Sequence, residues 1–145
     1  MVSFTGEYFH SIDAKGRLAV PAKFREALGA RFMVTKGLDG NLYLYTMEDW
    51  ESFVEKLRAI PMLGKENRQF VRFFLAGAQE VETDKLGRIL LSPALREYAD
   101  LEKDIVSIGV GTRAEIWSKD RWEDDQLGCD PSSMESQMVD LGIHF

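Results

Sequence analysis

The sequence has few of the residues on which disulfide-linked and metal-binding proteins depend. Its 145 residues include one cysteine and two histidines. Cys129 has no partner for an intrachain disulfide, which is typical of proteins kept in a reducing cytoplasm. Neither His10 nor His144 has a cysteine or a second histidine at the spacing of zinc ligands. We therefore expect neither a disulfide nor a metal site.

The chain also lacks the motifs of common enzyme classes and the segments that target or anchor proteins. It contains no Gly-x-Ser-x-Gly, no P-loop and no predicted strand followed by Gly-x-Gly-x-x-Gly. No stretch approaches the roughly 18 apolar residues of a membrane span. The N-terminus has neither the basic start nor the apolar core of a signal peptide. We expect a cytoplasmic protein that is not an enzyme, needs no cofactor, has no evident small-molecule substrate and does not bind membranes.

Basic side chains are fewer than acidic ones, and the two kinds are unevenly distributed along the chain. A net charge of −6 argues against a DNA binder that relies on bulk electrostatics. Residues 1–119 hold 17 basic and 17 acidic side chains, whereas 120–145 hold seven acids and one base, Arg121. The acidic tail is expected to be a solvated appendage or, alternatively, to repel or compete with DNA. Residues 1–72 hold 11 basic and 9 acidic side chains against 7 and 15 in 73–145, so the first half is favoured for phosphate contact.

The most informative feature that is present is an internal repeat. Residues 13–18, Asp-Ala-Lys-Gly-Arg-Leu, return 71 positions later as Asp-Lys-Leu-Gly-Arg-Ile in 84–89. Phe24-Arg25-Glu26 then matches Leu95-Arg96-Glu97. After a gain of one residue, Met33-Val34-Thr35 matches Ile105-Val106-Ser107. A match held over about forty positions indicates a duplication, and it favours a pseudo-symmetric binding protein over an enzyme.

Each copy is predicted to be a β-turn-β-α-β-β unit, from period-two strands and turn residues. The first copy predicts strands at 7–12, 17–20, 31–36 and 41–45, with a helix that begins at Pro21 and ends at Gly29. The second predicts strands at 78–83, 88–91, 105–108 and 114–117, with a helix at 93–99. Further helices are expected at 48–59, 65–76, from Lys119 onward and at 132–141. The predicted domains are a first unit (5–47), linking helices (48–76), a second unit (77–120) and an acidic tail (121–145).

The turn of both copies carries the pattern Asp-x-x-Gly-Arg. The aspartate can close the turn, the glycine permits the reversal, and an arginine can donate bidentately to phosphate oxygens or to a guanine edge. The alternative is an Asp–Arg pair that only stabilises a turn. The candidate DNA-binding residues are Asp13, Lys15, Arg17, Lys23 and Arg25 in the first copy, and Asp84, Lys85 and Arg88 in the second.

Three stretches near the N-terminus, 6–8, 10–18 and 20–25, resemble the MraZ family of bacterial transcriptional regulators of the division and cell-wall gene cluster. The second Asp-x-x-Gly-Arg, the Asp-Gly hairpin and the tryptophan-bearing helices also resemble its layout, over about residues 4–126. The resemblance implies an α+β fold. Its duplicated units would form one pseudo-two-fold swapped-hairpin (AbrB-like) β-barrel with flanking helices.

The same resemblance implies a function. It implies sequence-specific binding of double-stranded DNA at short direct repeats near the promoter of that gene cluster. A ring-like homo-oligomer, taken to be an octamer and associated with the nucleoid, would do the binding. The family motif falls on Asp13, Lys15 and Arg17, with Asp84 and Arg88 as the second set. Because the second copy has Leu86 in place of Lys15, the copies are expected to contribute unequally.

A neutral body binds DNA weakly as a monomer, so we expect oligomerisation to be required for tight binding. The aromatic stripes of 48–60 and 65–76 would then be core or subunit interface.

Two other interpretations of the residues stay open. The first alternative is a non-catalytic protein-interaction scaffold, and the second is an antitoxin-like module. In both, the Asp-x-x-Gly-Arg turns are purely structural.

Overall fold

The computed structural model describes residues 3–144, in which strands and helices occur at the predicted places. The strands are β1 (Glu7–Ser11), β2 (Arg17–Ala19), β3 (Arg31–Lys36), β4 (Leu42–Thr46), β5 (Gln79–Glu82), β6 (Arg88–Leu90), β7 (Asp104–Gly109) and β8 (Ala114–Ser118). The helices are α1 (Ala22–Leu28), α2 (Met47–Arg58), α3 (Lys65–Ala76), α4 (Pro93–Tyr98), α5 (Lys119–Leu127) and α6 (Pro131–Leu141). The predicted α+β class is confirmed, and element ends differ from prediction by about one residue.

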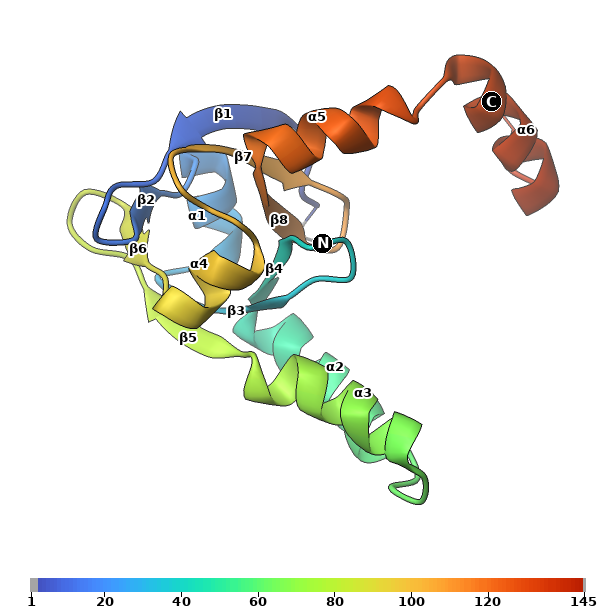
Figure 1. Cartoon of the computed structure of the whole chain (residues 1–145), viewed down its shortest axis with the longest axis horizontal. Helices are drawn as coiled ribbons and strands as arrows, with labels where there is room; N and C mark the ends of the chain where they lie inside the picture. Colours follow the sequence, from blue (N-terminus) through green and yellow to red (C-terminus); the bar gives the residue numbers. More distant parts are fainter. Residues whose placement is uncertain (1–2, 145) are drawn as a thin grey trace.

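The strands form one large and one small antiparallel sheet (Figure 1). The large sheet has the order β1-β7-β8-β4-β3-β5, and β2 pairs with β6 in a separate ribbon. The predicted closed β-barrel is wrong, because β1 and β5 are the two edges of an open sheet and do not pair with each other. The cause is the shortness of β2 and β6, three residues each, which leave the sheet after the turns. Beside β1, the β2 strand makes an isolated bridge from Leu18 to Ile12 and a backbone hydrogen bond from the Asp13 N–H to the Arg17 carbonyl.

The pairing registers of the two halves are reciprocal. His10 of β1 lies opposite Ile105 of β7, and Val81 of β5 lies opposite Phe32 of β3. Ile105 is therefore the counterpart of Phe32, so its sequence match to Met33 is wrong by one residue. The second copy gains two residues between its helix and third strand and loses one in the following hairpin. A sequence comparison registers only the net gain of one.

The main core lies between the large sheet, the β2–β6 ribbon and the helices α1 and α4. Alternate strand residues point into it, including Phe32 and Ile105, both fully buried. Phe24 of α1 packs edge-on against Tyr8, with ring centroids 5.2 Å apart. Leu18 and Ile89 close the core from the ribbon side. The ribbon is thereby held to the body by its inner face, and its outer face is left to solvent.

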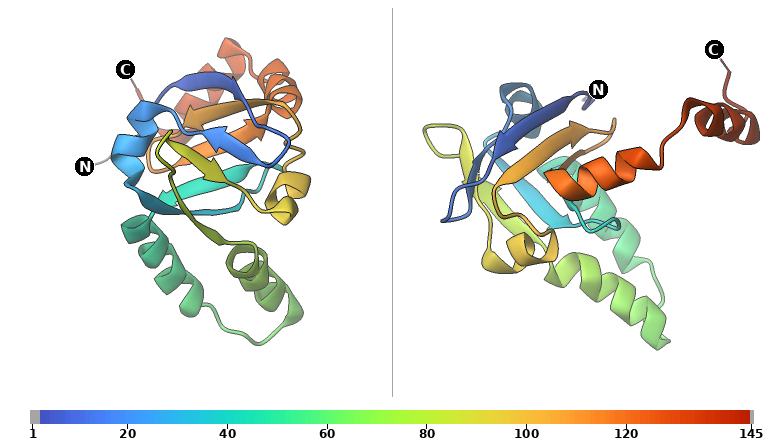
Figure 2. Two further views of the ribbon diagram at one scale, coloured as in Figure 1. Left: turned by 90° about the vertical axis from the view of Figure 1, so that its left-hand side faces the viewer. Right: turned by 45° about the horizontal axis from the view of Figure 1, so that its top comes forward.

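Helices cover parts of the other face of the large sheet (Figure 2). Leu57 of α2 and Phe74 of α3 pack on Tyr43, so the aromatic stripe of these helices is partly core. Farther along the same face, Trp122 of α5 packs edge-on against Trp117, with ring centroids 5.3 Å apart. No helix in residues 3–144 is long and apolar enough to cross a membrane.

Candidate nucleic-acid interface

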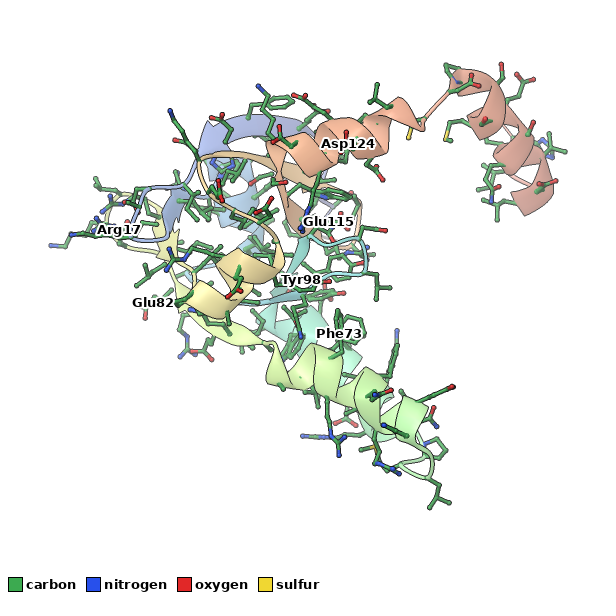
Figure 3. The ribbon with its side chains drawn as sticks, in the orientation of Figure 1. Arg17, Phe73, Glu82, Tyr98, Glu115 and Asp124 are labelled. Atoms are coloured by element: carbon green, nitrogen blue, oxygen red, sulfur yellow. The ribbon has the colours of Figure 1, made fainter. Side chains whose placement is uncertain are left out.

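The β2–β6 ribbon presents an arginine from each copy on one exposed face. Arg17 pairs with Leu90 and Ala19 pairs with Arg88. Side chains alternate along a strand, so these four residues share the outer face. Arg17 and Arg88 are diagonal neighbours in this register, about 7–8 Å apart. Figure 3 places Arg17 at the end of the molecule away from α3 and α5.

The first loop is organised by the carboxylate of Asp13. Its Oδ1 accepts the backbone N–H of Lys15 and of Arg17, both at 2.9 Å. Its Oδ2 accepts Nε of Arg17 at 3.1 Å. The backbone N–H of Gly16 donates to the Asp13 carbonyl at 3.0 Å. The arginine is thus held at Nε, and its terminal nitrogens have no hydrogen-bond partner in residues 3–144.

The second loop repeats these bonds in the same order. Oδ1 of Asp84 accepts the N–H of Leu86 and of Arg88 at 2.9 Å each, and Oδ2 accepts Nε of Arg88 at 2.9 Å. The side chains of Arg17 and Arg88 are similarly exposed, at 35% and 32%. The two copies therefore present equivalent arginines, although Leu86 stands in place of Lys15.

Glycine is required in both loops, and each glycine touches the opposite half. Gly16 has φ +91° and Gly87 has φ +76°, in the left-handed region. A Cβ on Gly16 would lie 2.6 Å from Nε of Arg96, which comes from α4. A Cβ on Gly87 would overlap the guanidinium of Arg25, which comes from α1. Each loop is therefore covered by an arginine of the other copy.

One predicted site residue, Arg25, lies at the loop of the other copy and not at the loop nearest to it in sequence. Arg25 belongs to the first copy, as Arg17 does, yet it lies half-buried against the second loop. Arg96, its counterpart at the same offset of 71, covers the first loop and was missing from the predicted set. The repeat itself contained the signal, since residues 24–26 match 95–97.

The two loops form one continuous surface. The N–H of Val20 donates to the Gly87 carbonyl at 3.0 Å, and the N–H of Leu91 donates to the Gly16 carbonyl at 2.9 Å. The structure thus brings together the residues predicted in both turns. Lys15 and Lys85 are exposed in the loops, whereas Lys23 is exposed on α1.

Hydrogen bonds lower the pKa of both loop carboxyls. For Asp13 the main cause is the backbone N–H of Arg17, opposed by desolvation and reinforced by the Arg17 side chain and the N–H of Lys15. For Asp84 the same contributions come from Arg88 and Leu86. The ionised carboxylates are therefore the form that holds the loops together.

We predict that the loops keep their geometry down to an unusually acidic pH. A lowered folded-state pKa means that the stabilisation is fully present above the unfolded value of about 3.9. It is lost as the pH falls through the lower folded-state pKa. Carbon-13 NMR titration of the Asp13 and Asp84 carboxyls should show midpoints below that of aspartate in an unstructured peptide. Midpoints at or above the peptide value would contradict the prediction.

A buried polar cluster lies away from this surface, and the sequence analysis missed it. Glu115 of β8 is 5% exposed. Its Oε1 accepts Nδ2 of Asn41 at 2.8 Å and Nε1 of Trp117 at 3.0 Å. Its Oε2 pairs with Arg113 at 2.9 Å, and that guanidinium lies 3.9 Å from the centre of the Tyr43 ring. All donors facing this carboxylate are satisfied, which is the arrangement of a structural network.

His10 lies on β1 and contacts the neighbouring strand β7. The ring of His10 is hydrogen-bonded to Oγ of Ser107 at 2.7 Å, and burial lowers its pKa. In the described part of the chain, no three His, Cys, Asp or Glu side chains are grouped to hold a metal ion. His10 is therefore a strand residue with an ordinary hydrogen-bond partner.

Comparison with known proteins gives a consistent result. The family model described as "MraZ protein, putative antitoxin-like" matches residues 3–73 and 74–134. The chain is 53% identical over 144 residues to a protein of Acetivibrio thermocellus and 52% identical over 141 residues to one of Clostridium beijerinckii. It is 54% identical over 142 residues to one of Desulfitobacterium hafniense. Each match covers 97% of this chain and 99% of the relative, and each relative is named "Transcriptional regulator MraZ". These names describe regulators and not enzymes, so the prediction that the chain is not an enzyme is confirmed.

Proposed function

This chain belongs to the MraZ family and is a transcriptional regulator, and we propose that it binds double-stranded DNA through the outer face of the β2–β6 ribbon. One observation carries the proposal: Arg17 and Arg88 emerge together on that face, each anchored at Nε by its own aspartate. A two-stranded ribbon fits the major groove. There the remaining guanidinium donors can bind the guanine O6 and N7 atoms or phosphate oxygens.

The neighbouring side chains suit the same role. Lys15 and Lys85 add positive charge beside the arginines, for contact with the DNA backbone. Leu86 and Leu90 are 71% and 55% exposed. Apolar side chains on a DNA-facing surface can contact the methyl group of thymine. The first loop, with Lys15, would favour phosphate, and the second, with Leu86, would favour a base edge.

Oligomerisation is part of the proposal. Each ribbon surface holds four basic side chains (Lys15, Arg17, Lys85 and Arg88) against Asp13 and Asp84, so one protomer makes few phosphate contacts. A ring-like homo-oligomer would present the same surface to consecutive short repeats. Linkage of this kind raises apparent affinity by about 10²–10⁴-fold. The repeats would lie near the promoter of the division and cell-wall gene cluster, so the protein would act in the cytoplasm at the nucleoid.

The domain organisation belongs to the same proposal. The two units, 5–47 and 77–120, would be related as in AbrB-like swapped-hairpin proteins, with both halves supplied by one chain. The reciprocal pairing of β1 with β7 and of β5 with β3 supports this relationship. Helices 48–76 and the acidic tail 121–145 would then be additions to the DNA-binding body.

We predict that Arg17→Ala lowers affinity for the DNA just upstream of the protein's own gene by about 5- to 150-fold, because one arginine contact is worth about 1–3 kcal/mol. Fluorescence anisotropy across a salt series would measure it, with scrambled DNA for comparison. Arg58→Ala is the matched control, because Arg58 is an exposed arginine paired with Glu55 on α2. Equal, weak binding to both DNAs that Arg17→Ala leaves unchanged would favour the scaffold or antitoxin-like alternatives.

A further inference from the structure

Two pairs of helices project from the body, and both carry uncovered apolar side chains (Figures 1 and 2). We call α2–α3 the helical arm and α5–α6 the acidic arm. The exposed apolar residues of the helical arm are Met62, Leu63, Phe70 and Leu75. Those of the acidic arm are Leu127, Met134, Val139, Leu141 and Ile143. Gathered exposed apolar residues of this kind mark interaction sites.

The helical arm carries a basic stripe along α3. Lys65, Arg68 and Arg72 are spaced i, i+3 and i+7, which places them on one side of the helix. None of them forms an ion pair within residues 3–144. Arg68 donates to the Met62 carbonyl at 3.1 Å, whereas Lys65 and Arg72 are exposed. Leu75 continues the stripe at its C-terminal end, so the surface combines positive charge with an apolar group.

The acidic arm carries the opposite charge. Residues 120–145 contain seven acids and one base, Arg121. That arginine faces the body, where it donates to the carbonyls of Gly40 at 2.8 Å and Tyr98 at 3.0 Å. The outer surface of α5 therefore presents carboxylates that no basic residue of the arm neutralises, apart from a 3.8 Å pair between Lys119 and Glu123.

A groove lies where this arm leaves the body. It is formed by the edge strand β1 and by α5, and its volume is about 720 Å³. Its lining includes the apolar side chains of Phe9, Trp122 and Leu127, and the carboxylates of Glu7, Glu123 and Asp124. Phe9 is 55% exposed and Leu127 is 84% exposed. The groove thus combines exposed apolar side chains with carboxylates, which suits a helix that is basic and partly apolar.

We propose that the helical arm of one copy packs into the acidic groove of the next copy. The basic stripe of α3 would face the groove's carboxylates, and Leu75 would lie beside its apolar residues. The inference rests on the homo-oligomer in the proposed function and names the surfaces that build it. The two surfaces differ, so the contact is heterologous, and every copy uses each surface once. Such contacts close into a ring when the rotation between neighbours allows it.

A second copy is the occupant that the charges favour, because both complementary surfaces are on this one chain. The two arms leave the body in different directions in Figures 1 and 2, which favours contact between copies over contact within one. The proposed contact also leaves the β2–β6 ribbon uncovered, since Arg17 lies at the end away from both arms (Figure 3). Assembly and DNA binding would therefore use separate surfaces.

Charge reversal with complementation tests this contact. Lys65→Glu with Arg72→Glu makes the stripe acidic, and Glu123→Lys with Asp124→Lys makes the groove basic. We expect each double variant to be monomeric by light scattering at concentrations where the wild type is oligomeric. Mixing the two variants in equal amounts should restore the wild-type mass, because reversed arm meets reversed groove and native arm meets native groove. A chain with all four changes should also assemble.

The controls separate this inference from the proposed function. Glu97→Lys with Glu102→Lys reverses two exposed carboxylates outside both arms and should leave the mass unchanged. Arg17→Ala should keep the wild-type mass while losing DNA affinity. Double variants that keep the wild-type mass, or whose mixture stays monomeric, would overturn the proposed contact without touching the DNA-binding ribbon. A stripe variant of full mass with lost DNA affinity would instead make α3 a DNA contact. A monomeric wild type would overturn the contact outright.

Discussion

Arg17→Ala combined with Arg88→Ala is expected to reduce affinity for the upstream fragment to that for scrambled DNA, a loss of about 10³-fold or more. The two side chains are neighbours on one ribbon, so the double variant removes the specific donors of both copies from the same surface. The lysines of the loops remain and would support only sequence-independent contact with phosphates. Anisotropy titration at fixed salt concentration measures the loss.

The two single variants divide this effect between the copies. Arg17→Ala should reduce the salt dependence of binding more than Arg88→Ala does, because the first loop, with Lys15, is the one expected to contact phosphate. Arg88→Ala should mainly reduce discrimination between sequences. The variants should keep the wild-type melting temperature to within a few degrees, since exposed pairs such as Arg17–Asp13 contribute about 0–1 kcal/mol. A double variant that still prefers the upstream fragment tenfold would place DNA recognition elsewhere on the protein.

Glu115→Ala is expected to destabilise the fold by about 2–4 kcal/mol, because it removes a buried carboxylate that binds three donors, among them the half-buried Arg113. The change leaves Arg113, Asn41 and Trp117 with unpaired donors at the centre of the large sheet. A typical domain has only about 5–15 kcal/mol of stability, so the variant should be close to unfolding at 37 °C. Urea unfolding followed by tryptophan fluorescence, at one fixed protein concentration, measures the free-energy change.

Glu115→Gln is the matched variant for this cluster. It keeps a side-chain oxygen for Asn41 and Trp117 but removes the charge that faces Arg113, so a smaller loss is expected. DNA affinity per folded protein should be unchanged in both variants, since the cluster lies away from the ribbon. A loss below about 1 kcal/mol for Glu115→Ala, the median range for exposed pairs, would show that water replaces the carboxylate.

The candidate site depends on both halves of the chain at once. The ribbon is made of β2 from the first copy and β6 from the second, and Arg25 and Arg96 cross over to the opposite loops. A three-residue strand has too few backbone hydrogen bonds to stand alone. Neither copy can therefore present its arginine in this geometry without the other, which gives the duplication a direct structural consequence.

Local structure was readable from the sequence because its interactions span few residues. The Asp13 carboxylate bonds residues two and four positions away, so the motif alone determined the turn, and the same spacing returns at Asp84. Helix and strand positions followed from apolar periodicity and from turn residues such as Asp39-Gly40. The internal repeat and the arginines of its turns were likewise evident without coordinates.

Tertiary structure alone decided the features that join distant residues. The open sheet, the one-residue correction to the repeat and the positions of Arg25 and Arg96 depend on strand pairing between the halves. The Glu115 cluster joins residues 74 positions apart, and no local pattern marks it. Both arms keep exposed apolar side chains because they pack on the body along only part of their length. Sequence periodicity says which face of a helix is apolar, whereas only packing determines whether this chain covers that face.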